Sequence, residues 1–160
     1  MASPRQRQEV IGVISDTHGL MRPEALAALA GVGRIIHAGD IGSPDVIAAL
    51  EAIAPVIAIR GNNDRFPWAR RLPATATVQS RGARLYVLHD VHELAVDPYA
   101  AGFAAVIAGH SHQPGIVERD GVLFVNPGSA GPRRFTLPVA VARLHVTGGT
   151  VRGAVVLLQV

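Results

Sequence analysis

The stretch Val10-Ile11-Gly12-Val13-Ile14-Ser15-Asp16-Thr17-His18 decides the fold, because a short apolar run ends there in a carboxylate and an imidazole. The run is largely β-branched, and short continuous runs of this kind are typical of strands buried on both faces of a sheet. Four more such runs follow, at Arg34–Ile36, Val56–Ile59, Leu85–Leu88 and Ala105–Ala108. We therefore expect five buried strands, each ending at a polar segment.

The segments between the first three runs have the composition of helices. Pro23–Val32 and Pro44–Ile53 are rich in Ala and Leu, and each has Pro at its start, where a missing backbone donor does not weaken a helix. The order strand, helix, strand, helix, strand is typical of a parallel sheet. Open parallel sheets bind ligands beyond the carboxyl ends of their strands, which is where the polar segments lie.

These polar segments carry carboxylate, amide and imidazole groups, and the chain has no Cys. The segments are Asp16-Thr17-His18, Gly39-Asp40, Gly61-Asn62-Asn63-Asp64, His89-Asp90 and Gly109-His110-Ser111-His112. Mixed oxygen and nitrogen donors favour divalent metal ions. The candidate ligands are Asp16, His18, Asp40, Asn62, His89, His110 and His112. A single four-coordinate ion would not need this many ligands. Two ions roughly 3.5–4 Å apart, sharing one carboxylate, would suit in-line attack at phosphorus.

The order D-x-H, G-D, G-N-x-D, H and G-H-x-H resembles the calcineurin-like metallophosphoesterases. The small size and the segment Asn126-Pro127-Gly128-Ser129 are similar to their small prokaryotic phosphodiesterase branch. Any one of these segments alone is also typical of a turn or loop, but five in the family order are not. The resemblance implies an α/β fold, a four-layer αββα sandwich of two mixed sheets flanked by helices, with the metal site at one edge. It also divides the ligands between two ions, with Asp16, His18, Asp40 and His112 on one side and Asp40, Asn62, His89 and His110 on the other.

The resemblance further implies a metal-dependent phosphodiesterase, a hydrolase in which a hydroxide bridging two divalent ions attacks phosphorus. The expected catalytic residues are Asp16, Asp40, Asn62, His89 and His110. Mn²⁺ is the expected metal, with Fe, Zn, Ni and Mg left open because occupancy in cells follows availability. The expected substrate is a small phosphodiester.

Two positions depart from the family pattern. Many relatives that hydrolyse monoesters have His where this chain has Asn63, and an amide cannot protonate a leaving group. General acid assistance is worth roughly 10² to 10⁴ in rate, so we expect activated leaving groups to be preferred. The small phosphodiesterase branch that this chain resembles also tends to lack this histidine, which favours diesters as substrates. Asp90 stands where relatives commonly have Gly in a His-Gly-His run, which displaces His92 by one position and leaves His89 as the ligand that ends the strand.

We expect the substrate contacts to lie beside the metal site, at Asn63, Asn126, Gly128, Ser129 and Arg133. The segment 126–129 ends a strand, and its Gly allows close backbone approach to a phosphate oxygen. A simple turn is the equal alternative there, and a solvated loop charge is the alternative for Arg133. We expect Asp64 to cap or support the site rather than bind metal, and His37 to be a core or supporting residue.

Two other functions stay open. A phosphomonoesterase would use the same ligands and differ only in substrate preference. A non-catalytic protein-binding scaffold of the same fold, as in the retromer subunit, would be expected to expose a broad apolar patch. Intact D-x-H and G-H-x-H segments, including His18, favour a working site.

The second half of the chain indicates antiparallel hairpins. Asp120-Gly121 and Gly148-Gly149 are strong hairpin signals, and Arg81-Gly82 is a third turn of this kind. The expected strand pairs are Ala74–Val78 with Ala83–Leu88, Gly115–Arg119 with Val122–Asn126, and Val139–Val146 with Val151–Leu158. Pro98–Gly102 predicts a short helix.

Length and composition set the remaining expectations. A chain of 160 residues that is 49% hydrophobic predicts one domain over residues 9–160, after a frayed tail over residues 1–8. The tail lacks the apolar segment of a signal peptide, and no run reaches the about 18 apolar residues of a membrane helix, so we expect a cytoplasmic protein with no membrane partner. A net charge of +3 does not indicate nucleic acid as a stable partner. Phe66 and Trp68 suit a contact between copies of the chain, which leaves a homo-oligomer open.

Overall fold

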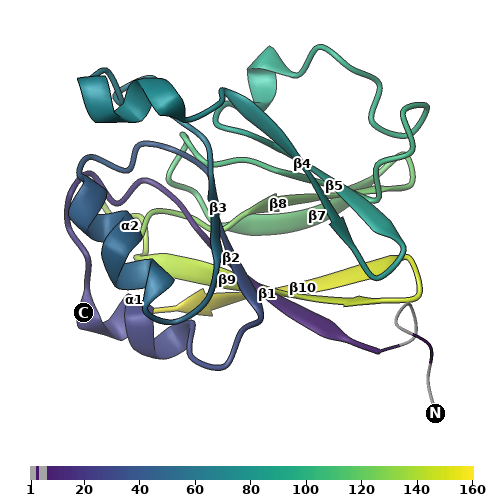
Figure 1. Ribbon diagram of the computed structural model, residues 1–160, viewed down its shortest axis with the longest axis horizontal. Coiled ribbons are helices and arrows are strands. Elements are labelled where there is room, and N and C mark those ends of the chain that lie inside the picture. The colour runs from purple at the N-terminus through teal and green to yellow at the C-terminus, as the bar shows by residue number, and fades with distance from the viewer. Residues whose placement is uncertain (1–2, 4–6) are drawn as a thin grey trace.

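The protein is described by a computed structural model covering residue 3 and residues 7–160, in which two five-stranded sheets pack face to face (Figure 1). The first sheet has the strand order β10-β9-β1-β2-β3 and the second the order β4-β5-β6-β8-β7. The strands are β1 (Glu9–Ile14), β2 (Arg34–His37), β3 (Val56–Ala58), β4 (Thr75–Ser80), β5 (Ala83–Leu88), β6 (Ala105–Ile107), β7 (Gly115–Arg119), β8 (Val122–Asn126), β9 (Ala140–Thr147) and β10 (Thr150–Leu157). The helices are α1 (Pro23–Ala28), α2 (Pro44–Glu51) and the 3₁₀ helices η1 (Pro67–Arg71) and η2 (Val91–Glu93). The expected α/β sandwich of two mixed sheets is therefore confirmed.

The first sheet contains the predicted parallel unit, because β1 pairs in parallel with β2 and β2 with β3. The helices α1 and α2 connect these strands and lie on the same side of the sheet (Figure 1). Leu29 and Leu50 from the helical segments pack with Ile35 against this outer face. Ser43 caps α2 by accepting a hydrogen bond from the Asp45 N–H at 3.2 Å, as a residue before a helix commonly does.

The second sheet is mixed as well. The strands β5, β6 and β8 run parallel, while β4 and β7 form antiparallel edges through the predicted hairpins. Its outer face carries a smaller apolar cluster that includes Val106 and Phe124, and Leu94 packs on it from the segment after η2. No α-helix covers this face among the described residues, so the fourth layer of the sandwich is an irregular segment here.

The predicted helix at Pro98–Gly102 is wrong, because this segment forms consecutive turns. The carboxylate of Asp97 accepts hydrogen bonds from the N–H groups of Tyr99 and Ala100. Gly102 then has a φ of 82°, a left-handed backbone that ends the segment. A side chain that competes for the first backbone donors favours a turn over a helix.

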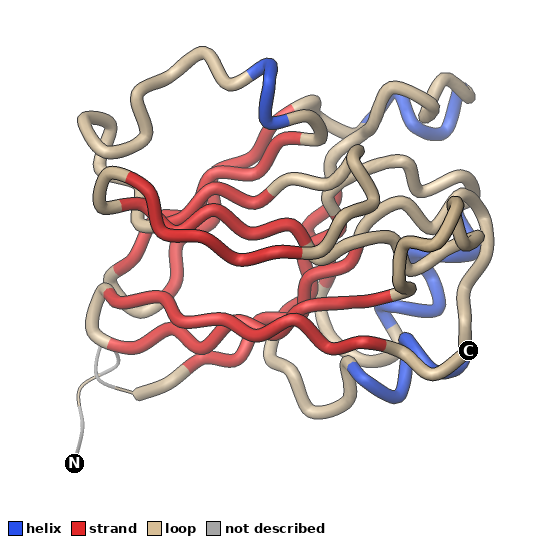
Figure 2. The backbone as a smooth tube through the Cα atoms, turned by 180° about the vertical axis from the view of Figure 1, so that it is seen from behind, coloured by secondary structure: helices blue, strands red, loops and turns tan. Residues whose placement is uncertain are grey.

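The core lies between the two sheets, which Figure 2 shows as two layers of strands. Ile11, Val13 and Ile36 from the first sheet pack there with Leu85 and Ile107 from the second, and all five side chains are fully buried. None of the described helices has the length and apolar character needed to cross a bilayer. Residues 1–2 and 4–6 of the predicted N-terminal tail lie outside the described residues.

Candidate metal centre

The predicted ligands lie at one edge of the sandwich, where strands of both sheets end. Asp16 and His18 follow β1, Asp40 follows β2 and Asn62 follows β3, all in the first sheet. The remaining ligands come from the second sheet: His89 follows β5, and His110 and His112 follow β6. Residues up to 96 positions apart in the sequence, as Asp16 and His112 are, therefore meet at the junction of the two sheets.

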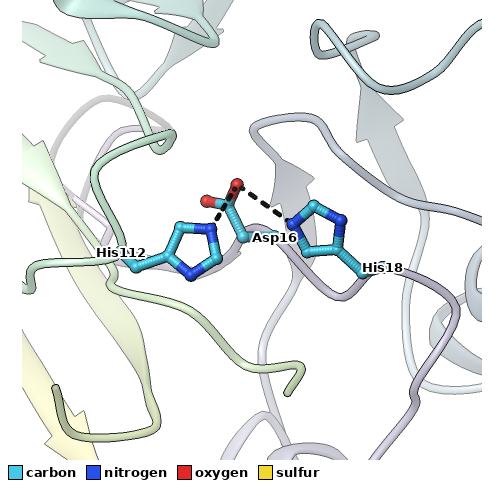
Figure 3. Close-up of side chains that lie close together, drawn as sticks. All are labelled: Asp16, His18 and His112. Carbon is cyan, nitrogen blue, oxygen red and sulfur yellow. Dashed lines mark ion pairs between the residues drawn. The ribbon is translucent and has the colours of Figure 1, made fainter. Parts of the chain in front are cut away.

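Asp16, His18 and His112 form the first candidate ligand group, with one donor atom from each within 4.8 Å of the others. Figure 3 shows the two imidazole rings facing the Asp16 carboxylate from opposite sides. The Asp16 Oδ1 atom lies 3.4 Å from His112 Nε2 and 3.8 Å from His18 Nε2. Asp16 and His112 are buried, so the group opens to solvent only on the side of His18.

Asp40, His89 and His110 form the second group, by the same measure. Asp40 Oδ2 lies 3.3 Å from His89 Nε2 and 3.7 Å from His18 Nε2, so this carboxylate faces both groups. The Asp16 carboxylate also faces both, at 3.7 Å from His89 Nε2. The two groups are therefore neighbours with carboxylates between them.

Asn62 lines a cavity of about 290 Å³ beside the second group. His89, Asp90 and His110 line the same cavity. The Asn62 side chain is exposed, and its backbone carbonyl accepts a hydrogen bond from Arg65 at 3.1 Å. This cavity gives the second group access to solvent.

The residues present fit divalent ions. Asp16 Oδ1, His18 Nε2 and His89 Nε2 are buried and have no hydrogen-bond partner among the described residues, although the two ring nitrogens lie 3.8 Å and 3.7 Å from Asp16 Oδ1. Buried polar atoms without partners are costly and uncommon in native proteins. Carboxylate oxygens and imidazole nitrogens directed at common points are what a divalent ion with mixed ligands needs.

Several ligands are fixed by neighbouring backbone and side-chain groups. The His89 Nδ1 atom lies 2.7 Å from the carbonyl oxygen of Ala38, which leaves Nε2 for the site. The second oxygen of Asp16, Oδ2, accepts hydrogen bonds from the Ser15 hydroxyl at 2.7 Å and the His110 N–H at 3.0 Å. Outer contacts of this kind orient metal ligands.

In the protein without metal, Asp40 and His89 each shift the pKa of the other. Burial alone would raise the pKa of the Asp40 carboxyl, but the contacts with the His89 ring and the Asn63 N–H outweigh this effect and lower the pKa to about 2. Burial lowers the pKa of His89, but the contacts with Asp40 and Ala38 raise it to about 9. A cation that binds here must therefore displace a proton from His89, since metal ligands bind in their deprotonated form.

Asn63 holds Asp40 in place. Its N–H donates to Asp40 Oδ1 at 2.9 Å and its side-chain amide donates to Oδ2 at 3.1 Å. The predicted substrate contact at Asn63 stays a prediction, and in this structure the amide supports a ligand.

His37 is fully buried beneath the site, at the end of β2. Its Nδ1 accepts the Gly39 N–H at 3.1 Å, so the ring proton must be on Nε2, which lies 3.0 Å from Thr17 Oγ1. The Thr17 hydroxyl in turn donates to the Ile41 carbonyl at 2.8 Å. Burial lowers the pKa of His37 to about 4, so this ring is neutral and joins the loops after β1 and β2.

Asp64 joins the loops after β2 and β3. Its buried carboxylate accepts hydrogen bonds from the N–H groups of Ile41, Gly42 and Gly61 at 2.8 to 3.1 Å. These loops carry Asp40 and Asn62. Asp64 therefore fixes the spacing between two candidate ligands.

The segment after β8 supports the site from the other side. The Asn126 amide donates to the Gly109 carbonyl and the Ser111 hydroxyl, both at 3.0 Å, and its oxygen accepts the Gly128 N–H at 2.9 Å. The buried Ser129 hydroxyl donates to the Asp16 carbonyl at 3.0 Å. These partners show how the segment holds the ligand loops, which local sequence did not reveal.

The remaining predicted substrate contacts are less engaged with the site. Gly128 is buried, and a side chain there would meet Pro114 at 3.0 Å. Arg133 is exposed in the loop that follows Gly131, where an added Cβ atom would meet the carbonyl oxygens of Asp16 and Thr17. Arg133 therefore stays a candidate for contact with an anionic substrate.

Five of the candidate ligands have left-handed backbone conformations. The φ angles are 55° at Asp16, 46° at His18, 55° at Asp40, 70° at His110 and 62° at His112. Non-glycine residues rarely adopt this conformation, and such residues gather at functional sites where the surrounding structure enforces them.

Asp90 and His92 lie beside the second group. Asp90 Oδ1 accepts the His92 N–H at 3.0 Å and lies 3.0 Å from His92 Nδ1, while Oδ2 lies 3.7 Å from His110 Nε2. Burial alone would raise the pKa of Asp90, but the hydrogen bonds from His92 and the nearby His110 outweigh this effect, so the pKa lies below its ordinary value. The His92 side chain itself is 89% exposed and does not line the cavity.

Two mixed sheets with carboxylates and imidazoles at one edge are the features expected of the metallophosphoesterase fold. Residues 10–149 match the calcineurin-like phosphoesterase superfamily domain, and the chain belongs to this family. A probable metallophosphoesterase of Methanothermobacter thermautotrophicus is 36% identical over 151 residues, covering 87% of each chain. A phosphodiesterase of Methanocaldococcus jannaschii is 29% identical over 137 residues, covering 74% of this chain and 82% of the relative.

Solved structures share this fold. A structure titled as a novel archaeal phosphodiesterase is 26% identical with a TM-score of 0.76, covering 92% of this chain and 99% of that one. Vps29 of Chaetomium thermophilum has the same TM-score at 21% identity, covering 94% of this chain and 97% of its own, which shows a shared fold.

Proposed function

We propose that this protein is a phosphodiesterase that depends on two divalent metal ions. The observation that carries the proposal is the pair of adjacent ligand groups with Asp40 facing both. Two bound ions would supply a hydroxide for attack at phosphorus and neutralise the charge of the transition state. Mn²⁺ is the ion we propose first, since the ligands are oxygen and nitrogen donors, and Fe, Zn, Ni and Mg are the alternatives.

The chain's own residues orient the groups that bind these ions. Asp16, His18, Asp40 and His112 would hold one ion, and Asp40, Asn62, His89 and His110 the other. Asn63 donates to both oxygens of Asp40 and so fixes this carboxylate. His89 presents Nε2 because Ala38 occupies Nδ1.

The proposed choice of diesters rests on the relatives named as phosphodiesterases, and the proposed preference for activated leaving groups rests on the residue that follows Asn62. The Asn63 amide is engaged by Asp40 and has no acidic proton at neutral pH. A poor leaving group would therefore lack assistance from this position, and general acid assistance is worth roughly 10² to 10⁴ in rate. We expect aryl diesters to be hydrolysed faster than alkyl diesters.

The test is hydrolysis of an aryl phosphodiester and its matching monoester by metal-stripped protein titrated with Mn²⁺. We expect metal-dependent diester turnover that is abolished in Asp40→Ala and His110→Ala. His145→Ala is the matched control, because this histidine lies in β9, outside both ligand groups. A large preference for the monoester would replace our proposal with a phosphomonoesterase.

The second candidate is a protein-binding scaffold, which the likeness of fold to Vps29 raises. It would be favoured by a wild-type chain that binds metal, hydrolyses neither substrate with any of the five ions, and forms a stable complex with a protein. The two adjacent ligand groups favour the enzyme.

A further inference from the structure

Asp90 is held rigidly at the end of β5, immediately after His89. It starts η2, and both the N–H and the Nδ1 of His92 lie 3.0 Å from its Oδ1 atom. Two contacts on one oxygen fix the carboxylate and leave Oδ2 available to another partner.

The free oxygen faces the ring of His110, with Oδ2 at 3.7 Å from Nε2. With 44% of its side chain exposed, His110 is the least buried imidazole of the two ligand groups. The His89 ring is fixed by the Ala38 carbonyl, whereas among the described residues no hydrogen bond fixes the ring of His110. Asp90 is the charged group placed to do so.

Asp90 is not an additional ligand in this arrangement. The donor atoms of the second group lie within 4.8 Å of one another, and the Asp90 carboxylate is outside that group. Its Oδ2 atom lies 3.7 Å from Nε2 of His110 instead, at the wall of the same cavity.

We propose that Asp90 is a positioning residue for His110. Its carboxylate accepts the Nε2–H of the ring, so that Nδ1 is the nitrogen that faces Asp40, His89 and a bound cation. A metal-binding imidazole commonly donates its other N–H to a carboxylate, which fixes the tautomer and strengthens the ligand. The present distance is that of an ion pair, and we expect it to shorten when a cation binds, as contacts in unliganded sites often do.

This assignment rests on the proposed two-metal function, and its first test is metal binding rather than turnover. Calorimetric titration of the metal-stripped protein with Mn²⁺ should show two sites. In Asp90→Ala we expect the Kd of one site to rise 10- to 100-fold, the usual effect of removing such a partner, and the other Kd to stay unchanged.

The matched control is Asp97→Ala. Asp97 also accepts backbone N–H groups from the following residues in an exposed turn, but it faces no ligand group. We expect both of its Mn²⁺ dissociation constants to equal those of the wild type. Asp90→Asn keeps an acceptor oxygen at the same place, so it should lose less affinity than Asp90→Ala and serves as the test if the alanine variant does not fold.

The second readout is the tautomer of His110 in the diamagnetic Zn²⁺-loaded protein. Long-range ¹H–¹⁵N spectra should show a protonated Nε2 and a zinc-bound Nδ1, and the Nε2–H signal should shift upfield in Asp90→Asn. Zinc on Nε2, or a wild-type Kd pair retained in Asp90→Ala, would overturn the assignment. A wild-type protein that binds only one ion would instead overturn the proposed function itself.

Discussion

The carboxylate of Asp64 should be one of the largest single contributors to stability outside the core. In Asp64→Ala, the N–H groups of Ile41, Gly42 and Gly61 lose their acceptor. An unsatisfied buried donor costs about 1 to 3 kcal/mol, and water can reach the part-buried Gly42 and Gly61. We therefore expect a loss of about 3 to 5 kcal/mol in the free energy of unfolding, a large share of the roughly 5 to 15 kcal/mol of a typical domain.

Urea denaturation of the metal-free protein measures this loss. Asp64→Asn keeps the shape and one acceptor oxygen, so about half of the loss is expected from it. Asp97→Ala again gives the matched comparison, because its hydrogen bonds are exposed and should be worth less than about 1 kcal/mol. If Asp64→Ala cost no more than Asp97→Ala, the view that Asp64 fixes the loops after β2 and β3 would be refuted.

Two further predictions concern residues beneath and beside the ligands. The pKa of His37 in the folded protein is about 4, below its ordinary 6.5, so its contribution of about 3 kcal/mol to the free energy of unfolding is complete above pH 6.5 and is lost as the pH falls toward 4. Denaturation of metal-free wild type and His37→Gln across this range should show the steeper loss of stability at acid pH in the wild type. Parallel profiles would contradict this prediction. Gly109→Ala would place a methyl group 2.0 Å from Ser15 Oγ and 2.6 Å from Asp16 Oδ2, so we expect the free energy of unfolding to fall by about 1 to 3 kcal/mol and Mn²⁺ binding, measured by calorimetry, to weaken. Gly115 has open space around it, so Gly115→Ala should change neither quantity. Equal effects of the two substitutions would argue against crowding at Gly109.

The architecture followed from the sequence because strong local signals and packing agreed. The β-branched runs that end at Asp16 and Asp40 form strands, and the turns at Asp120-Gly121 and Gly148-Gly149 form hairpins. The predicted helix from Pro23 ends earlier, at Ala28, and Gly31 just beyond it has a φ of 81°. Helix ends depend on such local details and are the least predictable part of a pattern.

The positions of the ligand segments were predictable, but the partners of their neighbours were not. Ser129 bonds to the carbonyl of Asp16, 113 positions away in the chain. Asn63 turns its amide to Asp40, 23 positions away. A local pattern shows that a polar residue lies near the site, whereas the choice between substrate and ligand support depends on the tertiary structure. The contact of Asp90 with His110 likewise appears only once β5 and β6 lie side by side.

The left-handed backbone at five candidate ligands bears on how such a site persists through mutation. Gly would relax the backbone at Asp16, His18 or His112 by on the order of 1 kcal/mol, while removing the donor atom. Mutational drift governed by folding alone would therefore tend to erase these side chains one at a time. Keeping non-glycine residues at these positions therefore costs folding stability, which is the expected cost of holding donor atoms in the site.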